Sequence, residues 1–344
     1  MTKDSQTRMA HEVAEIPRAA ARFLSGSVET VAAAAAGLRA ANPGLVATIA
    51  RGSSDHAATY LKYAIELAAG VPVASVGPSV ASVYGRQLRL SGAACIGISQ
   101  SGKSPDIVAM MASARAGGAL TLALTNHDDS PMAAAVAHPI SLMAGPETSV
   151  AATKTFVNSV LAGLSLLAEW QEDDALRQAV LALPDAFAKA LTLDWSPLAR
   201  RLVRAQSLYV LGRGPAYAIS NEVALKFKET SGLHAESYSA AEVLHGPAAI
   251  VQGQFPVLAL SVDDAAQPHV IATAERLAAQ GADVFITGTA AKGCAELPTV
   301  TGLHPLVAPL VLIVSFYSFV EALARRRGFD PDTPPHLRKV TETM

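Results

Sequence analysis

Short apolar runs alternate with longer helical stretches along this chain, and that alternation constrains the fold more than any other feature. In the first half the runs "LVATIA", "ACIGIS" and "ALTLAL" consist mainly of apolar and β-branched residues, and helical sequence or a polar turn separates them. Uninterrupted apolar strands joined through helices are typical of parallel sheets covered on both faces. We therefore predict a doubly wound α/β unit between Leu45 and Leu167.

The same pattern begins again in the second half. The run "SLYVLGRG" leads into a helical stretch at 216–232, and "FPVLALS" leads into another at 268–281. Gly52 and Gly214 are 162 positions apart, and so are Ser99 and Ser261. Two strand-end positions with one common offset indicate an internal duplication of the α/β unit. A chain of 344 residues is long enough for two such units.

The fold class that we predict is α/β, with two tandem doubly wound units whose parallel sheets carry helices on both faces. The Ala-rich stretch at 28–41 predicts a helix that packs on the first unit. The Pro-rich tail predicts a segment that runs over the surface. The predicted organisation is an N-terminal helical segment, a first unit, a helical linker, a second unit and a tail, at 1–43, 44–170, 171–198, 199–328 and 329–344.

Composition excludes several classes of function. The chain has 27 basic and 29 acidic residues and no block of like charges, so nothing predicts binding to nucleic acid or to an anionic membrane. Cys95 and Cys294 lack a second Cys or a His at ligand spacing, so we expect no metal and a reduced, cytoplasmic setting. The apolar run at 306–320 contains Pro309 and is shorter than the roughly 20 residues of a membrane span, which predicts a buried helix.

Two serine-rich loops follow neighbouring predicted strands. In a parallel sheet, ligands bind beyond the carboxyl ends of the strands, where helix N-termini supply N–H groups to anions. Gly102 lets the backbone approach such a ligand closely. The alternative is that Ser53 and Ser104 are ordinary helix N-caps. Because the loops combine at two strand ends, we favour a cradle for a phosphate monoester, formed by Ser54, Ser99, Gln100, Ser101 and Ser104.

Glu222, Lys226 and Glu229 are spaced by four and three residues, so on a helix they share one face. The alternative is a solvated ladder of ion pairs. The apolar neighbours Val223 and Phe227 favour burial. A lysine between two partly buried carboxylates has its titration set by them, which suits a group that transfers protons.

Five motifs occur in one order: "ARGSSDHA", "SQSGKSPD", "GPETSVAATKTF", the run at 212–247, and "DTPPHLRKVT". Together they resemble the sugar isomerase (SIS) domain proteins over about residues 30–344. Within that family the chain is most similar to the isomerase half of glutamine–fructose-6-phosphate aminotransferase and to stand-alone SIS-type glucosamine-6-phosphate deaminases. The resemblance implies two flavodoxin-like SIS units, a bound sugar phosphate, no cofactor, and an active site completed across a homodimer.

The resemblance also implies a role for individual residues. The serine-loop residues named above would hold the phosphate, and further contacts with the substrate would come from Gly52, Gly102, Lys103 and Val150. Glu229 would be the base that moves a proton between C1 and C2, with Glu222 and Lys226 beside it. His245 would open the sugar ring and reach the site of the neighbouring subunit. Lys339 would form a Schiff base with the sugar carbonyl, and the tail would close as a lid. Without the resemblance, His245 is an ordinary loop histidine and Lys339 a solvated tail lysine.

The chain departs from the synthase pattern in two ways. Lys103 stands where the synthase motif "SQSGET" has Glu, and it adds a cation beside the phosphate cradle. No cysteine is placed as a glutaminase nucleophile, so we expect no glutaminase domain. The favoured function is a hydrolase that deaminates and isomerises glucosamine 6-phosphate to fructose 6-phosphate and ammonia. The alternatives are a fructosamine-6-phosphate deglycase, a glutamine-independent phosphosugar isomerase, and a non-catalytic sugar-phosphate sensor.

Overall fold

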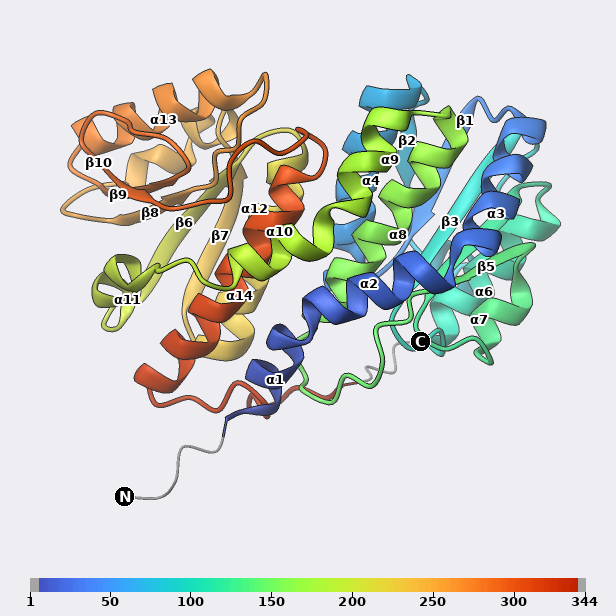
Figure 1. Ribbon diagram of the computed structural model, residues 1–344, viewed down its shortest axis with the longest axis horizontal. Coiled ribbons are helices and arrows are strands. Elements are labelled where there is room, and N and C mark those ends of the chain that lie inside the picture. The colour runs from blue at the N-terminus through green and yellow to red at the C-terminus, as the bar shows by residue number, and fades with distance from the viewer. Residues whose placement is uncertain (1–5, 340–344) are drawn as a thin grey trace. The chain divides into compact units, whose positions relative to one another are not determined.

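The computed structural model describes residues 6–339 and contains two parallel five-stranded sheets (Figure 1). The first has the order β2-β1-β3-β4-β5 and the second the order β10-β9-β8-β6-β7. The strands are β1 (Leu45–Ile49), β2 (Val73–Ser75), β3 (Ala93–Ser99), β4 (Leu120–Thr125), β5 (His138–Ser141), β6 (Ser207–Gly212), β7 (His234–Ser239), β8 (Pro256–Ala259), β9 (Asp283–Thr287) and β10 (Cys294–Leu297). The predicted fold class is confirmed.

The first unit comprises residues 16–147, 154–184 and 338–339 of the described chain. All seven residues of β3 are buried, because this central strand has helices on both faces of its sheet. Met110 and Met111 pack against one face with Cys95. The helices of this unit are α2 (Ile16–Gly26), α3 (Val28–Ala41), α4 (Ser53–Ala69), α5 (Ser79–Ser82), α6 (Pro105–Ala116), α7 (Pro131–Ala135), α8 (Lys154–Gln171) and α9 (Asp174–Leu181). The Ala-rich helix α3 packs on α8 and β5, as predicted.

The second unit comprises residues 6–15, 148–153 and 185–337. Its core includes Tyr209, Leu211 and Val257 from the sheet and Val270 from a covering helix. The helices are α1 (Arg8–Ala14), α11 (Ser196–Leu202), α12 (Pro215–Ser231), α13 (Gln267–Ala279) and α14 (Ala308–Arg326), with 3₁₀ turns η1 (Glu242–His245) and η2 (Pro247–Ile250). Helix α10 (Leu183–Ala190) begins in the first unit and ends in the second.

The two units repeat one another element by element. Helices α4 and α12 are both 17 residues long and begin 162 positions apart, and α6 and α13 begin at the same offset. Gly52 and Gly214 precede α4 and α12 with φ values of 54° and 60°, and Gly70 and Gly232 end these helices in the left-handed conformation. The starts of the first four strands keep this offset to within one residue, whereas β5 and β10 start 156 positions apart. The predicted duplication is therefore present in the backbone.

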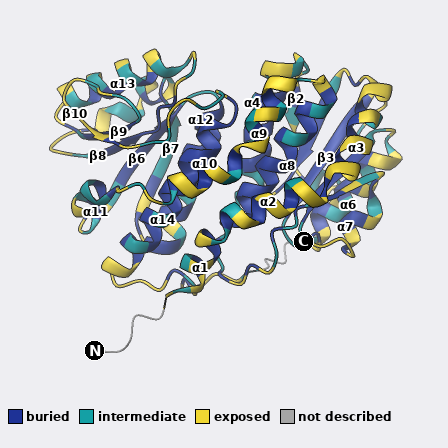
Figure 2. Ribbon diagram, in the orientation of Figure 1, coloured by how far each residue is buried: buried dark blue, intermediate teal, exposed yellow. Residues whose placement is uncertain are grey.

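Helix α14 contains most of the apolar run that the sequence singles out. It is long and apolar enough to cross a membrane by composition, and it is the one such helix in the described residues, but 83% of its apolar window is buried inside the chain. Phe316 and Phe319 contact Phe227 of α12 edge to face in the second unit. Figure 2 shows the strands and the inner helix faces in the colour of buried residues. The predicted buried helix is confirmed.

Candidate active site

The two serine-rich loops lie at the same edge of the first sheet. Strands β1 and β3 are parallel neighbours, with Ile49 paired to Gly97, so the loops that follow them leave the sheet side by side. Arg51 joins the loops directly, because its Nη2 atom lies 3.0 Å from Oδ2 of the buried Asp106 in the first turn of α6. The structure thus brings the half-buried Ser54 together with the loop at 99–104.

Gly102 fixes the shape of the second loop. Its φ is +61°, and a Cβ atom at this position would collide with the side chain of Ser130 and with Oγ1 of Thr125. The Gly102 N–H donates to Ser99 Oγ at 3.1 Å, and its carbonyl accepts from the Met132 N–H at 3.1 Å. Only glycine combines this conformation with this close packing.

The N-terminus of α6 lies at the end of the second serine loop. Ser104 occupies the N-cap position, but its side chain makes no capping hydrogen bond. The N-cap of α4 is Gly52 rather than a serine. The simple capping explanation of these serines is therefore not supported, and in the first turn of α6 the Ile107 N–H donates to Oδ1 of Asp106 at 2.9 Å. Ser101 and Ser104 are half-buried, whereas Lys103 is exposed and makes no ion pair within residues 6–339.

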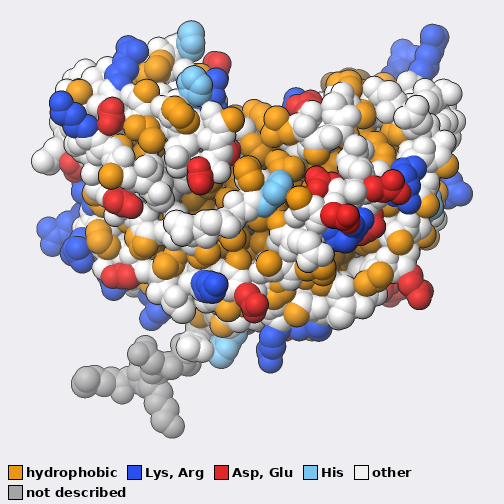
Figure 3. All heavy atoms as spheres, turned by 45° about the horizontal axis from the view of Figure 1, so that its top comes forward, with side chains coloured by type: hydrophobic (Ala, Val, Ile, Leu, Met, Phe, Trp, Pro, Cys, Tyr) orange, Lys and Arg blue, Asp and Glu red, His pale blue; other side chains and the backbone are white. Residues whose placement is uncertain are grey.

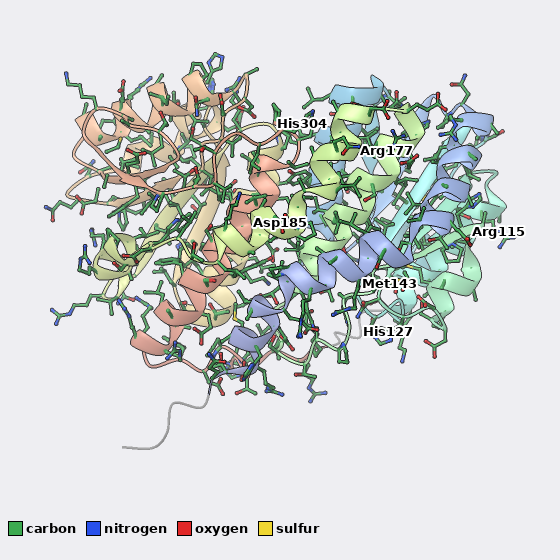
Figure 4. All side chains as sticks on the ribbon, viewed as in Figure 1. Arg115, His127, Met143, Arg177, Asp185 and His304 are labelled. Atoms are coloured by element: carbon green, nitrogen blue, oxygen red, sulfur yellow. The ribbon has the colours of Figure 1, made fainter. Side chains whose placement is uncertain are left out.

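Charge at the two ends of α6 follows the helix dipole. Arg115 lies in the last turn, where a cation is favoured, and Figure 4 labels it at that end of the first unit. Asp106 in the first turn is paired with Arg51, so it does not leave an unbalanced negative charge beside the serines. On the face of the molecule in Figure 3, basic and acidic side chains are interspersed.

Lys339 belongs to the same unit as the serine loops. Its Nζ atom lies 2.7 Å from Oε2 of Glu147, a carboxylate whose side chain is completely buried. Glu147 also accepts from the N–H and the hydroxyl of Thr155, at 3.1 and 2.7 Å. The tail lysine is therefore held by a fixed partner and is not merely solvated.

Helix α12 carries the second set of predicted residues. The side chains of Glu222 and Lys226 are 0% exposed, and that of Glu229 is 18% exposed. Lys226 Nζ lies 3.3 Å from Glu222 Oε1 and also forms an ion pair with Glu229 Oε2. Tyr317 of α14 donates its hydroxyl to Glu222 Oε1 at 3.1 Å. The three side chains share one face, as their spacing predicts, and their burial rules out a solvated ladder.

The charges around Lys226 fix its protonation. Burial by itself lowers the pKa of this lysine, but the charges and hydrogen bonds of Glu222 and Glu229 outweigh burial and raise the pKa above its ordinary value. Lys226 is therefore a permanent ammonium at neutral pH. Glu229 is the least buried member of the network, with 18% of its side chain exposed.

Two other predicted residues lie in loops of the second unit. His245 ends η1, is exposed, and makes no hydrogen bond or ion pair with the α12 network among the described residues. Val150 is half-buried, and its N–H donates to the Asp332 carbonyl at 3.3 Å. The adjacent Ser149 N–H donates to Glu12 of α1 at 3.2 Å, so an N-terminal helix fixes this loop.

Three residues of this region were missed by the sequence predictions. Arg51 lies in the motif "ARGSSDHA" and Glu147 in the motif "GPETSVAATKTF". Their place in these motifs could have indicated that both residues belong to the site. Tyr317 comes from the distant helix α14, and no local spacing indicates it. Among residues 6–339, no group of three or more His, Cys, Asp or Glu side chains is placed to bind a metal.

The sequence model of the SIS domain matches residues 41–169 and 201–326, one match for each sheet. The chain belongs to the SIS domain family. It is 32% identical to the isomerizing glutamine–fructose-6-phosphate aminotransferase of Symbiobacterium thermophilum, over 96% of this chain and 58% of that protein. The same enzyme of Aeropyrum pernix is also 32% identical, over 96% and 56% of the two chains. The chain thus spans little more than half the length of these curated relatives.

Solved structures agree with the family. A protein of Silicibacter pomeroyi, provisionally described as a phosphosugar isomerase, is 55% identical with a TM-score of 0.92, over 95% of this chain and 100% of that one. The C-terminal domain of glucosamine-fructose-6-phosphate aminotransferase from Francisella tularensis has a TM-score of 0.85 at 23% identity, over 97% and 100%. Glucosamine-6-phosphate deaminase of Thermotoga maritima has a TM-score of 0.77 at 20% identity, over 98% and 100%. The last two likenesses establish the shared fold.

Proposed function

We propose that this SIS protein deaminates and isomerises an aminosugar phosphate, converting glucosamine 6-phosphate and water into fructose 6-phosphate and ammonia. The observation that carries the proposal is the network on α12, in which a buried ammonium holds two carboxylates and only Glu229 is open to a ligand. A folded protein gains little stability from such a buried network, so a catalytic use explains it better. The similarity to phosphosugar isomerases and to the aminotransferase supports the substrate class.

Each residue set has a part in this reaction. The hydroxyl groups of the serine loop and the N-terminus of α6 hold the phosphate. His245 transfers the proton that opens the sugar ring to the aldehyde. Glu229 removes the proton from C2 and returns it to C1, and one proton of the C2 amine passes to the C1 oxygen, which leaves an imine at C2 and a hydroxyl at C1. Lys339 adds to that carbon as ammonia departs, and water then releases the ketone and the lysine.

The proposal is tested by release of ammonia and fructose 6-phosphate from glucosamine 6-phosphate. Glu229→Gln should lower kcat by about 10²–10⁴-fold, the usual contribution of a general base. Lys339→Ala should also lower it strongly. Lys228→Gln is the matched control, because this lysine lies exposed on the same helix and should keep wild-type turnover.

Several outcomes would overturn the proposal. Turnover that survives both Glu229→Gln and Lys339→Ala would remove the mechanism. Tight binding of sugar phosphates without turnover would identify a sensor. Faster release of an amino acid from fructosamine 6-phosphates than of ammonia from glucosamine 6-phosphate would identify a deglycase.

We also propose that the chain acts as a homodimer in which His245 serves the partner's site. In the single chain His245 is exposed, and the nearby Ile250 is 59% exposed, which suits a surface that a second copy covers. Mixing inactive His245→Ala and Glu229→Gln chains should restore activity, because a mixed dimer contains one site with both native residues. A mixture that stays inactive although mixed dimers form, or a fully active monomer, would contradict this arrangement.

A further inference from the structure

Glu147 is a buried carboxylate whose charge points at a proposed reacting atom. Its side chain is 0% exposed, and its Oε2 atom lies 2.7 Å from Nζ of Lys339, which is itself 23% exposed. A buried carboxylate is costly unless a cation or several donors compensate its charge. The contact spans 192 positions of sequence, so the fold and not local structure brings the two side chains together.

Thr155 holds the Glu147 carboxylate in one orientation. Its backbone N–H donates to Oε1 at 3.1 Å and its hydroxyl donates to Oε2 at 2.7 Å. Thr155 lies in the first turn of α8, one residue after the buried Lys154. These donors fix the carboxylate while Oε2 still contacts the amine of Lys339. A fixed oxygen beside an amine is the geometry that proton transfer requires.

We propose that Glu147 is the acid–base group for the amine of Lys339. This inference rests on the proposed function, in which Lys339 forms a covalent imine with the sugar. A lysine side chain is an ammonium at neutral pH and must lose a proton before it attacks a carbon. In the proposed function, the serine loop holds the phosphate and Glu229 on α12 transfers the proton between C2 and C1. Neither is assigned to remove the proton from Lys339.

The step balances when it is written for fructose 6-phosphate, the proposed product. Glu147 takes one proton from the Lys339 ammonium, and the neutral amine forms a C–N bond to C2. The carbonyl oxygen becomes a hydroxyl group by taking up the second proton of that nitrogen. Glu147 then gives its proton to this hydroxyl, which leaves as water. The products are a protonated imine, one water and the original carboxylate, and the net charge is unchanged. In the deamination direction, water hydrolyses the lysine imine to fructose 6-phosphate by the same transfers in reverse order.

A purely structural role is the competing explanation, because the ion pair also ties residues 338–339 to the loop at 142–147 within the first unit. The two explanations differ in their dependence on pH. A missing proton acceptor is replaced by hydroxide and bulk water at high pH, whereas a lost anchor is not.

The test is borohydride trapping of the imine between fructose 6-phosphate and Lys339, followed by mass spectrometry of the modified peptide from pH 6 to 10.5. Glu147→Gln should trap about 100-fold more slowly than wild type at pH 7 and approach the wild-type rate at pH 10.5. Glu147→Asp keeps a carboxylate and should retain more of the rate than Glu147→Gln. Glu169→Gln is the matched control, since Glu169 pairs with Arg177 (labelled in Figure 4) in the same unit and should trap like wild type.

A second measurement needs no sugar and separates the inference from the proposed function. Reductive methylation of Lys339 by formaldehyde at pH 8 should be several-fold slower in Glu147→Gln, because the formaldehyde imine needs the same proton transfers from the amine, whereas a carboxylate that only pairs with the ammonium would leave the rate unchanged or raise it when removed. Methylation of Glu147→Gln at or above the wild-type rate, trapping unaffected by Glu147→Gln, or a trapping defect that persists at pH 10.5 would each overturn the role of Glu147. If wild type forms no sugar adduct while the methylation rates differ as expected, the imine of the proposed function fails and the proton acceptor stands.

Discussion

Helices α4 and α12 hold equivalent places in the two units, yet they bury different chemistry. Tyr60 and Ala64 on the buried face of α4 stand 162 positions before Glu222 and Lys226. Leu67, which is 66% exposed, stands at the position of Glu229. Length, capping glycines and place in the sheet are the same. The backbone of this fold therefore tolerates either an apolar or an ionic buried face, and the ionic face needs an explanation beyond packing.

The loops after β3 and β8 also differ, but here the distinctive polar residues belong to the first unit. Ser99 and Ser261 end the two runs, but at the positions of Ser101, Gly102 and Ser104 the second loop has Asp263, Asp264 and Ala266. The Asp264 carboxylate accepts the Ala266 N–H at 2.9 Å, so the position that an anion would take before α13 is already filled by the chain itself. Under the proposed function, the first unit holds the phosphate and the second carries the helix that transfers the proton, so the duplication divides the two tasks.

The largest expected effect on stability comes from replacing Lys226, the cation of the α12 network, with an uncharged residue. Lys226→Met leaves Glu222 buried without its cation, which should lower the free energy of unfolding by about 3–5 kcal/mol. Removing both charges, with Glu222→Leu added, should recover part of that loss because no unpaired charge is left. Urea unfolding checks both, with Lys228→Met as the exposed control on the same helix. A double variant less stable than the single one would contradict this account.

The next effect tests whether the two units share one backbone requirement. Gly52 and Gly214 have φ near +54° and +60° with ψ near −133° and −139°, and a Cβ atom would meet nothing within 4 Å at either position. Only conformational strain opposes alanine there, so Gly52→Ala and Gly214→Ala should each cost about 1–3 kcal/mol. Thermal unfolding measures both. Clearly unequal losses would show that one of the turns has a further role.

Asp264→Ala should have a smaller effect, because it removes a cap from α13. Burial raises the pKa of Asp264, and the bonds from the Ala266 and Gln267 N–H groups oppose that rise by favouring the carboxylate. The loss should be about 0.5–2 kcal/mol. Added inorganic phosphate should restore part of it by occupying the vacated helix end. Melting curves with Asp263→Ala, the exposed neighbour, provide the control, and identical behaviour of the two variants would disprove the cap.

The comparison also explains which elements the sequence could predict. Strands β1, β3, β4, β6 and β8 are predictable because burial makes them continuously apolar. The edge strands β2, β5 and β10 have three or four residues, and "HPIS" and "CAEL" contain groups that a half-exposed edge accepts but no apolar run contains. Their short length and mixed composition give no signal above that of a loop.

The same limit applies to the site. The serine loop and the face of α12 are local patterns, so spacing along the chain was enough to predict them. The contact of Lys339 with Glu147 and that of Tyr317 with Glu222 join residues that are far apart in sequence. Such contacts depend on how the elements pack, and no periodicity encodes them.

The last prediction uses the two cysteines, one in each unit, and concerns reactivity rather than stability. Cys95 lies in β3 with no exposed surface, and burial raises its pKa to about 12, so at pH 8 it carries almost no thiolate. Cys294 begins β10 and is half-buried, and burial together with the charge of Glu275 raises its pKa less strongly. A thiol reagent should therefore label Cys294 at least about 100-fold faster than Cys95 in the folded protein.

The pH dependence has a definite sign. Because a raised thiol pKa delays ionisation, the labelling rate of Cys294 should still be rising with pH at pH 9, where an ordinary thiol begins to level off. Cys95→Ser and Cys294→Ser assign the two rates. Rapid labelling of Cys95 would mean that the central strand of the first sheet opens readily, and the sheet would then be a poor support for a rigid phosphate loop at the end of β3.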